Sequence, residues 1–265
     1  WQVEFRDFWP FEKGLVNEVV FEFGEYVAPT CALNLFPGQE AQDVEVTSML
    51  TWESSENAAG YFINLGTLQD EFNILQKVDA GNVTSFDPGM LECGVDYYYQ
   101  VIPYNNFGEA AECGVESFKT EYVVASSSGE EEVCKGDIVS LSANGGNSYE
   151  WFPEDYLDNP GIQNPVSTPP ESIEYTVIVY NENGCFDTTS LSIIVSEVVI
   201  TVDSVNHVRT GLPGFIDIAV NDDLDDYTYD WTGPNGFSAN TQDIENLEIG
   251  CYDLVVTNVV NDCSA

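Results

Sequence analysis

The densest group of candidate metal ligands in the sequence is an acidic run, Asn221-Asp-Asp-Leu-Asp-Asp226. Calcium takes about six to eight oxygen ligands, and a loop between two strands can supply several of them as carboxylates. Asp222, Asp223, Asp225 and Asp226 could act in this way, although the run lacks the DxDxDG spacing of a calcium loop. The run therefore has two interpretations, a Ca²⁺ site or a solvated acidic turn, and no other cofactor is expected.

No group of residues predicts catalysis. His207 is the only histidine, and no cysteine or serine motif lies beside it, as a nucleophile with its base would require. The GxSxG, HExxH and phosphate-binding motifs are absent. Carboxylates are so numerous that no glycosidase pair can be selected. We therefore expect no catalytic residues and no enzyme activity.

Seven cysteines lie at domain-like spacings near predicted strand ends. This usage indicates an oxidising, extracellular or cell-surface setting. A CxxC pair is absent and there is a single histidine, so zinc chemistry is not predicted. No apolar run reaches about 18 residues, so no membrane-inserted helix is expected, and no signal peptide is visible.

The charge balance excludes some classes of partner. The chain of 265 residues carries 46 acidic and 6 basic residues, a formal net charge of -40. Phosphate binding needs Lys and Arg, so neither nucleic acid nor an anionic membrane surface is an expected partner. The charge favours solubility in a salty or calcium-containing medium, with specific cation sites as the second interpretation.

Apolar residues alternate with polar ones in short runs separated by Gly, Pro and Asn turns, as in strands with one buried face. This pattern predicts an all-β fold of tandem antiparallel β-sandwiches, joined like beads on a string. Stacking on sugars is a second interpretation for the aromatic residues, but those at alternating strand positions are expected in the cores. Exposed contacts are expected at Tyr104 and Phe107. The residues expected in the cores are Trp52, Tyr97, Trp151, Trp231 and Tyr252.

Residues 30–122 contain Leu91-x-x-Gly94-x-x-Tyr97, the sequence of a tyrosine corner, followed by alternating Tyr99 and Val101. Together with Leu50-Thr-Trp52 and the PYNNFGEA loop, the segment resembles a fibronectin type III domain, of a variant associated with surface proteins of Bacteroidetes. Cys31 before the first strand and Cys113 before the last could tie the two ends together. Such a disulfide would contribute roughly 2–4 kcal/mol.

The polar stretch VVASSSGEEE predicts a boundary, and residues 123–196 follow as the next domain. Their set C-x-G-D, Y-x-W, NPV, Y-x-V and NGC is similar to the Ig-like, PKD-type repeats of the same surface proteins. Cys134 and Cys185 match the disulfide positions of that family, so the resemblance implies a bond between them.

Residues 197–265 carry YTYDWTGPNGF, DIENLEIGCYDLVVTN and a final CSA. This run resembles the SprB-type repeat, named after a gliding-motility adhesin, but lacks the cysteine that the family has after its first strand. A bond between Cys251 and Cys263 or an external partner remains open, and the partner of Cys93 is undetermined. Since the family continues into one more strand, this repeat is expected to lack its last strand.

Residues 1–29 show two alternating runs, Trp1 to Phe5 and Val19 to Phe23. They are similar to the last strands of a proprotein-convertase P-domain jelly roll, and a generic β-hairpin is the alternative. These apolar faces have no domain of their own. We therefore expect the chain to be an excerpt of a longer surface protein, or to be completed by a neighbouring copy.

Three residues are candidates for glycosylation. Asn82-Val-Thr84 is an N-glycosylation sequon. Thr188 and Ser204 lie in Asp-Ser/Thr motifs that resemble the O-glycosylation motif of Bacteroidetes.

These observations predict a non-catalytic extracellular module array that acts as a stalk, a surface fibre or an adhesin segment. Expected partners are neighbouring domains or copies of the same protein, with surface glycans or other cell-surface proteins as alternatives. Two rival hypotheses remain. One is a self-assembling fibre subunit joined by strand exchange or end-to-end docking. The other is an accessory region of a secreted enzyme, such as a protease, whose catalytic domain would lie outside this sequence.

Overall fold

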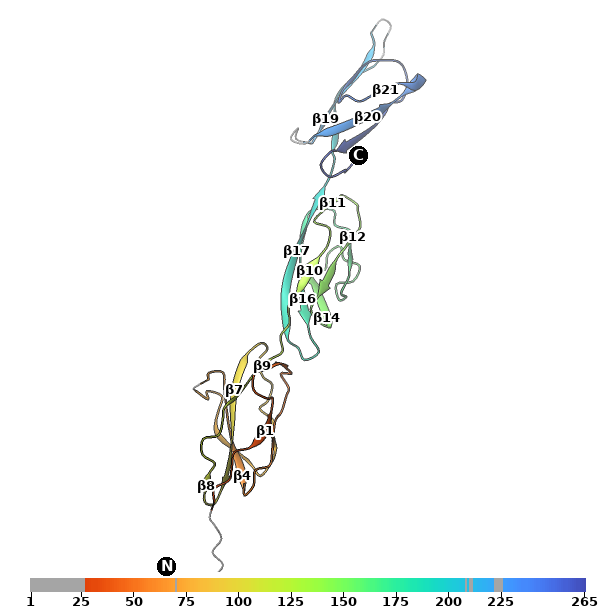
Figure 1. Cartoon of the computed structure of the whole chain (residues 1–265). Helices are drawn as coiled ribbons and strands as arrows, with labels where there is room; N and C mark the ends of the chain where they lie inside the picture. The colour runs from red at the N-terminus through yellow and green to blue at the C-terminus, as the bar shows by residue number, and fades with distance from the viewer. Residues whose placement is uncertain (1–26, 70, 208, 210–211, 222–225) are drawn as a thin grey trace, which may run out of the picture. The chain divides into compact units, whose positions relative to one another are not determined.

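The computed structural model describes residues 27–69, 71–207, 209, 212–221 and 226–265 (Figure 1). Within these ranges all regular structure is β-strand apart from one short 3-10 turn, η1 (Pro234–Gly236). The predicted all-β class is therefore confirmed. Both runs expected to form strands within residues 1–29 fall in residues 1–26, which lie outside the described residues. No helix in the described ranges has the length and apolar character needed to cross a membrane.

The chain forms two compact units. The first takes the described residues up to 40 together with 49–88 and 96–118, and the second takes 41–48, 89–95 and 119–265. The predicted fibronectin-like segment thus contributes two short stretches, 41–48 and 89–95, to the second unit.

The first sandwich is built from two sheets, ordered β1-β3-β6 and β2-β9-β7-β4-β5, with β8 beside β7. The residues along β7 alternate between buried and half-buried. Successive side chains of a strand point to opposite faces, so one face of β7 packs on the core. Trp52 on β3 meets Tyr61 on β4 at 5.3 Å between ring centroids, which brings the two sheets together. The strands are β1 (Leu33–Phe36), β2 (Ala41–Val44), β3 (Leu50–Glu53), β4 (Gly60–Gly66), β5 (Leu75–Gly81), β6 (Ser85–Phe86), β7 (Asp96–Asn105), β8 (Gly108–Glu109) and β9 (Glu116–Thr120).

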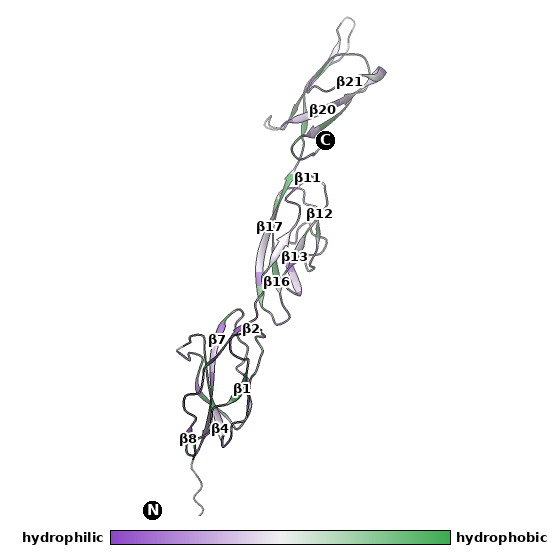
Figure 2. Ribbon diagram, in the orientation of Figure 1, coloured by the Kyte–Doolittle hydropathy of each residue, from purple (hydrophilic) through white to green (hydrophobic). Residues whose placement is uncertain are grey.

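The second sandwich has a four-stranded sheet, β11-β17-β16-β14, and two small sheets, β10-β13 and β12-β15. Tyr175, Val177 and Val179 on β16 are fully buried, and hydrophobic and hydrophilic residues mingle along the strands (Figure 2). Ser126–Ser128, expected as a polar join, instead pairs with β13 through its backbone. The strands are β10 (Ser126–Ser128), β11 (Glu132–Cys134), β12 (Val139–Ser140), β13 (Ser142–Asn144), β14 (Ser148–Phe152), β15 (Val166–Ser167), β16 (Ile173–Tyr180) and β17 (Phe186–Ser196).

The third sandwich has two three-stranded sheets, β18-β19-β22 and β21-β20-β23. Its core centres on Trp231 with Ile218, Val220 and Val256 around it. After β23 the chain turns back, so that Ala265 exchanges two backbone hydrogen bonds with Val256. The strands are β18 (Ile200–Asn206), β19 (Gly214–Val220), β20 (Tyr227–Thr232), β21 (Ser238–Ala239), β22 (Ile244–Leu247) and β23 (Asp253–Asn258).

The core tryptophans of the second and third sandwiches are held in the same way. The indole Nε1 of Trp151 donates to the Ile162 carbonyl at 3.0 Å, and that of Trp231 donates to the Thr241 carbonyl at 2.9 Å. The acceptor lies 11 residues after Trp151 in the first case and 10 residues after Trp231 in the second. A buried indole N–H usually finds such a partner, and these two sandwiches provide it in the same way, whereas the buried indole N–H of Trp52 in the first sandwich has none among the described residues.

Tyr99 gives a test of the first core. Its hydroxyl is buried and donates to the Pro37 carbonyl at 2.7 Å, and burial, followed by the Glu116 carboxylate, raises the pKa of Tyr99. Y99F removes the donor and leaves a buried carbonyl unpaired, so it should lower the free energy of unfolding by about 1 kcal/mol. The matched control is Y98F, on the half-buried face of the same strand. Equal losses for the two variants in thermal unfolding would contradict this role for the hydroxyl.

Candidate functional site: the disulfide cross-links

Three disulfides join distant parts of the sequence. Cys31 bonds to Cys113 with an S–S distance of 2.07 Å and Cα atoms 5.3 Å apart, inside the first unit. This pairing was expected from the sequence. It links the residue before the first strands of the sandwich to the approach to its last strand, β9.

The predicted bond between Cys134 and Cys185 is wrong. Cys134 bonds to Cys263, and Cys185 bonds to Cys93. Cys134 ends β11, where it lies opposite Ser196 at the far end of β17, whereas Cys185 directly precedes Phe186, the first residue of that strand. Strands rise about 3.3 Å per residue, so some 30 Å separate the two cysteines. Disulfides require Cα atoms within about 7 Å.

The alternative bond between Cys251 and Cys263 is not formed either. Cys251 is a free, exposed thiol. It precedes β23 whereas Cys263 follows it, so the strand keeps the two apart.

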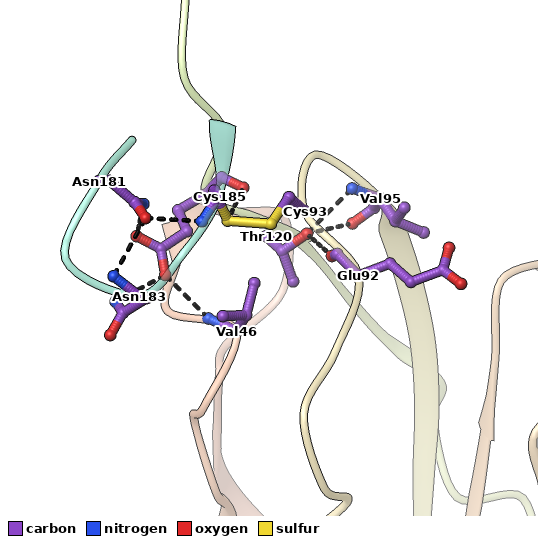
Figure 3. The surroundings of a disulfide bond; sticks show 9 residues. Val46, Glu92, Cys93, Val95, Thr120, Asn181, Asn183 and Cys185 are labelled. Atoms are coloured by element: carbon purple, nitrogen blue, oxygen red, sulfur yellow. Dashed lines mark hydrogen bonds between the residues drawn. A yellow bond between two sulfur atoms is a disulfide. The ribbon is translucent and has the colours of Figure 1, made fainter. Parts of the chain in front are cut away.

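The Cys93–Cys185 disulfide lies inside the second unit, beside a carboxylate that accepts three hydrogen bonds (Figure 3). Glu121 Oε1 accepts from the backbone N–H of Val46 at 3.0 Å and from the Asn183 amide at 2.7 Å. Its Oε2 accepts from the Asn181 amide at 2.7 Å. We call Val46, Glu121, Asn181 and Asn183 the Glu121 clamp. It reinforces the disulfide with charge-assisted hydrogen bonds, which are stronger than neutral ones.

The turn that carries Cys185 is preorganised by Asn181. Its side-chain oxygen accepts from the backbone N–H groups of Asn183 at 3.0 Å and Cys185 at 2.9 Å. Gly184 takes a positive φ of 86°, a conformation that costs glycine little. The sequence Asn-x-Asn-Gly-Cys therefore fixes both amides and the sulfur on one tight turn.

The other side of this disulfide is held by a buried threonine. Thr120 Oγ1 donates to the Glu92 carbonyl at 2.7 Å and accepts from the Val95 N–H at 2.9 Å, on either side of Cys93. Gly94, at φ +69°, donates its N–H to the Glu121 carbonyl at 2.9 Å. We call Leu91–Val95 the first corner, and these bonds fix its backbone.

The Cys134–Cys263 disulfide repeats the same chemistry. Glu132 Oε1 accepts from the Asn261 amide and from the Ser196 hydroxyl, each at 2.9 Å. These two bonds, in that order, hold the pKa of Glu132 below its usual value. Asn261 in turn accepts from the Cys263 N–H at 3.1 Å. Each of these two cross-links therefore pairs a disulfide with a glutamate and an asparagine side chain.

The acidic run at residues 222–226, the predicted Ca²⁺ site, is not part of these disulfide cross-links. Asp222, Asp223 and Asp225 lie outside the described residues, and Asp226 is exposed directly before β20. Among the residues that are described, no three His, Cys, Asp or Glu side chains gather as a metal site would require. The Ca²⁺ interpretation stays a prediction.

The glycosylation candidates are all exposed. Asn82 lies in the short connection after β5, while Thr188 and Ser204 lie within strands β17 and β18 rather than in turns. Modification at the three residues stays a prediction.

The aromatic residues divide largely as expected. Trp52, Tyr97, Trp151 and Trp231 are buried, Tyr252 is half-buried, and Phe107 is 55 % exposed. Tyr104 is half-buried and its hydroxyl donates to Asp79 at 2.8 Å. His207 is exposed.

Comparison with known proteins assigns no family. No family model matches the chain. One curated protein, a Kelch domain-containing protein of Sulfurisphaera tokodaii, is 42 % identical over 52 residues, which is 20 % of this chain and 7 % of that protein. The chain therefore spans a small part of that relative's length.

Several solved structures align over most of the chain. The chicken CNTN1 FN1-FN3 domains are 17 % identical over 88 % of this chain and 94 % of that one, with a TM-score of 0.27. Three N-terminal domains of the bacteriophage RB49 Highly Immunogenic Outer Capsid protein are 12 % identical over 90 % and 95 %, with a TM-score of 0.45. The human desmocollin-1 ectodomain is 11 % identical over 90 % and 57 %, with a TM-score of 0.24. At these scores the fold rests on the strands and sheets described above.

The Glu121 clamp gives a test. E121A removes an acceptor from three donors, so it should lower the free energy of unfolding of the second unit by about 1.5–3 kcal/mol. It should also speed hydrogen exchange at the Asn183 and Cys185 amides. The matched control is E131A, an exposed glutamate on the approach to β11. Unchanged exchange in E121A would show that the disulfide alone holds the turn.

The Glu132 contacts predict a pH effect. Because the folded pKa of Glu132 is lowered, its contribution to stability is present above the pKa of the unfolded state and is lost as the pH falls through the folded pKa. NMR titration of the side-chain carboxyl carbons should give Glu132 a lower pKa than an unperturbed glutamate. N261A should raise that pKa, and the exposed control N240A should not. A pKa that N261A leaves unchanged would argue against the contact.

Proposed function

We propose that this chain is a non-catalytic, extracellular spacer, a stalk segment of a surface protein whose disulfides make it inextensible under tension. The observation that carries this proposal is the order of the three disulfides along the sequence. The first closes residues 31–113 and the third closes residues 134–263. The second, between residues 93 and 185, encloses the segment that joins them.

This order defines the path that a pulling force takes. Tension entering at Cys31 crosses to Cys113 through sulfur, follows the backbone to Cys134 and crosses to Cys263 through sulfur. Only roughly 20 residues of backbone lie on that path, and fully extended they span about 70 Å. Residues inside the two outer loops lie off this path, so the third sandwich, whose strands all fall between Cys134 and Cys263, need not resist the force.

Half of the backbone segment on the path is strand. β9, β10 and β11 occupy Glu116–Thr120, Ser126–Ser128 and Glu132–Cys134. Strands are close to full extension, so unfolding a sandwich releases little length from this segment. The chain is thus suited to keep a fixed reach, which is the property a stalk needs.

The remaining observations agree with a surface setting. Three disulfides form and persist in oxidising compartments. The net charge of -40 keeps neighbouring copies apart and in solution. Neighbouring modules of the same protein are the partners we favour. A cation bound to the acidic run at residues 222–226 would relieve local repulsion and stiffen the third sandwich.

Single-molecule force spectroscopy tests the proposal. With handles at the two ends of the oxidised chain, the stretch from Cys31 to Cys263 should extend to about 70 Å, whereas the reduced chain of roughly 230 residues should reach about 800 Å. Equal contour lengths in the two states would refute the load path.

Two double variants sharpen the test. C134S/C263S forces the load through Cys93–Cys185, so the limit should rise to about 340 Å, for roughly 100 residues. C93S/C185S should leave the limit unchanged, because that disulfide is not on the shortest path. Both expectations follow from the pairing alone, so a reversed outcome would identify a different load path.

A further inference from the structure

The third sandwich contains a second corner that matches the first in sequence and position. Leu91-Glu-x-Gly94 precedes the long strand β7, and Leu247-Glu-x-Gly250 precedes β23. Both leucines are buried, at 7 % and 6 % exposure. We call Leu247–Tyr252 the second corner.

The second corner is fixed from within. The Tyr252 hydroxyl donates back to the Glu248 carbonyl at 3.1 Å, and its ring packs edge-on against Phe237 at 5.1 Å between centroids. A side chain at Gly250 would meet Pro234 at 2.6 Å, so glycine lets the corner close against the η1 turn. This surface is therefore formed before any partner binds it.

The two corners differ in what covers them. The first corner bears the Asn181–Cys185 turn through the Cys93–Cys185 disulfide, beside the Glu121 clamp. No disulfide joins a turn from the described residues to the second corner, and Ile249 is 83 % exposed. Beside it lies a pocket of about 370 Å³. Its apolar lining includes Val205, Phe215 and Tyr252, and its polar lining includes Asn206 and Glu248.

From this match we propose that the second corner and its pocket are the docking surface for the asparagine-rich turn of a further β-sandwich, located later in the same polypeptide. The inference rests on the proposed module array. We place the partner later in the polypeptide because of the two cross-links of the second unit. In both, the turn bearing the later cysteine also bears an asparagine that caps that cysteine's N–H, Asn181 for Cys185 and Asn261 for Cys263.

The chemistry of the surface suits such a turn. Glu248 Oε2 accepts from the Asn235 amide at 2.9 Å. The same carboxylate can accept from a second asparagine amide, as Glu121 does from Asn181 and Asn183. Ile249, Val205 and Phe215 would lose their exposed apolar area to the incoming module, and burial of apolar area from water stabilises such a contact. Cys251, exposed on the corner itself, reports whether the surface is covered.

The test uses the secreted protein in its native, unreduced form, as isolated from the cells that make it. It is alkylated with iodoacetamide without denaturation, digested, and mapped by mass spectrometry. We expect Cys251 to escape alkylation. We also expect it to be linked to a cysteine beyond residue 265 that follows an asparagine within about four residues, the spacing of the two turns described above.

Other outcomes overturn the inference. They are an alkylated Cys251, a bond to Cys251 of a second copy, or a mixed disulfide with glutathione. The other three disulfides in the same digest separate this failure from failure of the proposed function, because they set the load path whether or not Cys251 is covered.

Surface variants give an independent readout. In the full polypeptide, I249D should make Cys251 open to alkylation, because it places a charge in the apolar contact. The matched control V260D changes a residue that is 76 % exposed and outside the corner, and it should leave Cys251 protected. Equal protection in both variants would show that the corner is not the docking surface.

Discussion

The constraint on which the rest of the structure depends is the pairing of six cysteines across the sandwiches. Three small β-sandwiches each bury only a modest core, and small domains gain little stability from burial alone. Cross-links that close 82, 92 and 129 residues compensate by restricting the unfolded chain. Because the closed segments overlap in sequence, they also route tension through the short backbone segment between Cys113 and Cys134.

The charge of the chain determines which donors pair with the glutamates beside its disulfides. With 46 acidic and 6 basic residues, few carboxylates can have a cationic partner. Glu121 and Glu132 are instead satisfied by neutral donors, which are asparagine amides, a serine hydroxyl and a backbone N–H. Neutral donors leave the overall repulsion of the chain unchanged while fixing the local geometry. The turns beside the cysteines are accordingly rich in asparagine.

The sequence predicted the features that depend on local alternation of apolar and polar residues. Alternation placed Trp52, Trp151 and Trp231 in cores. It missed features that depend on where strand ends lie in space. Cys134 was assigned to Cys185 because the two match the disulfide positions of the Ig-like, PKD-type repeats, but the eleven-residue strand β17 puts them at opposite ends. Asn183 entered the prediction only as part of the NGC motif and Asn181 was not singled out, although two asparagines before Gly-Cys could have indicated a polar contact beside that cysteine.

The load path separates the stability of a sandwich core from the length of the chain under tension. These two properties are coupled in modular stalks that lack such cross-links. In an array without such cross-links, each sandwich bears the full tension, so the strength of the stalk is limited by its least stable core. Here Trp151 and Trp231 both lie inside the segment that Cys134–Cys263 closes, so that disulfide bypasses both. Loss of a core contact in the third sandwich should therefore lower its melting temperature without lengthening the chain under tension. The second sandwich is different, because its edge strands β10 and β11 lie on the path. Its attachment to the load depends on hydrogen bonds between β11 and β17, and the Cys93–Cys185 disulfide limits how far those strands can separate once they part.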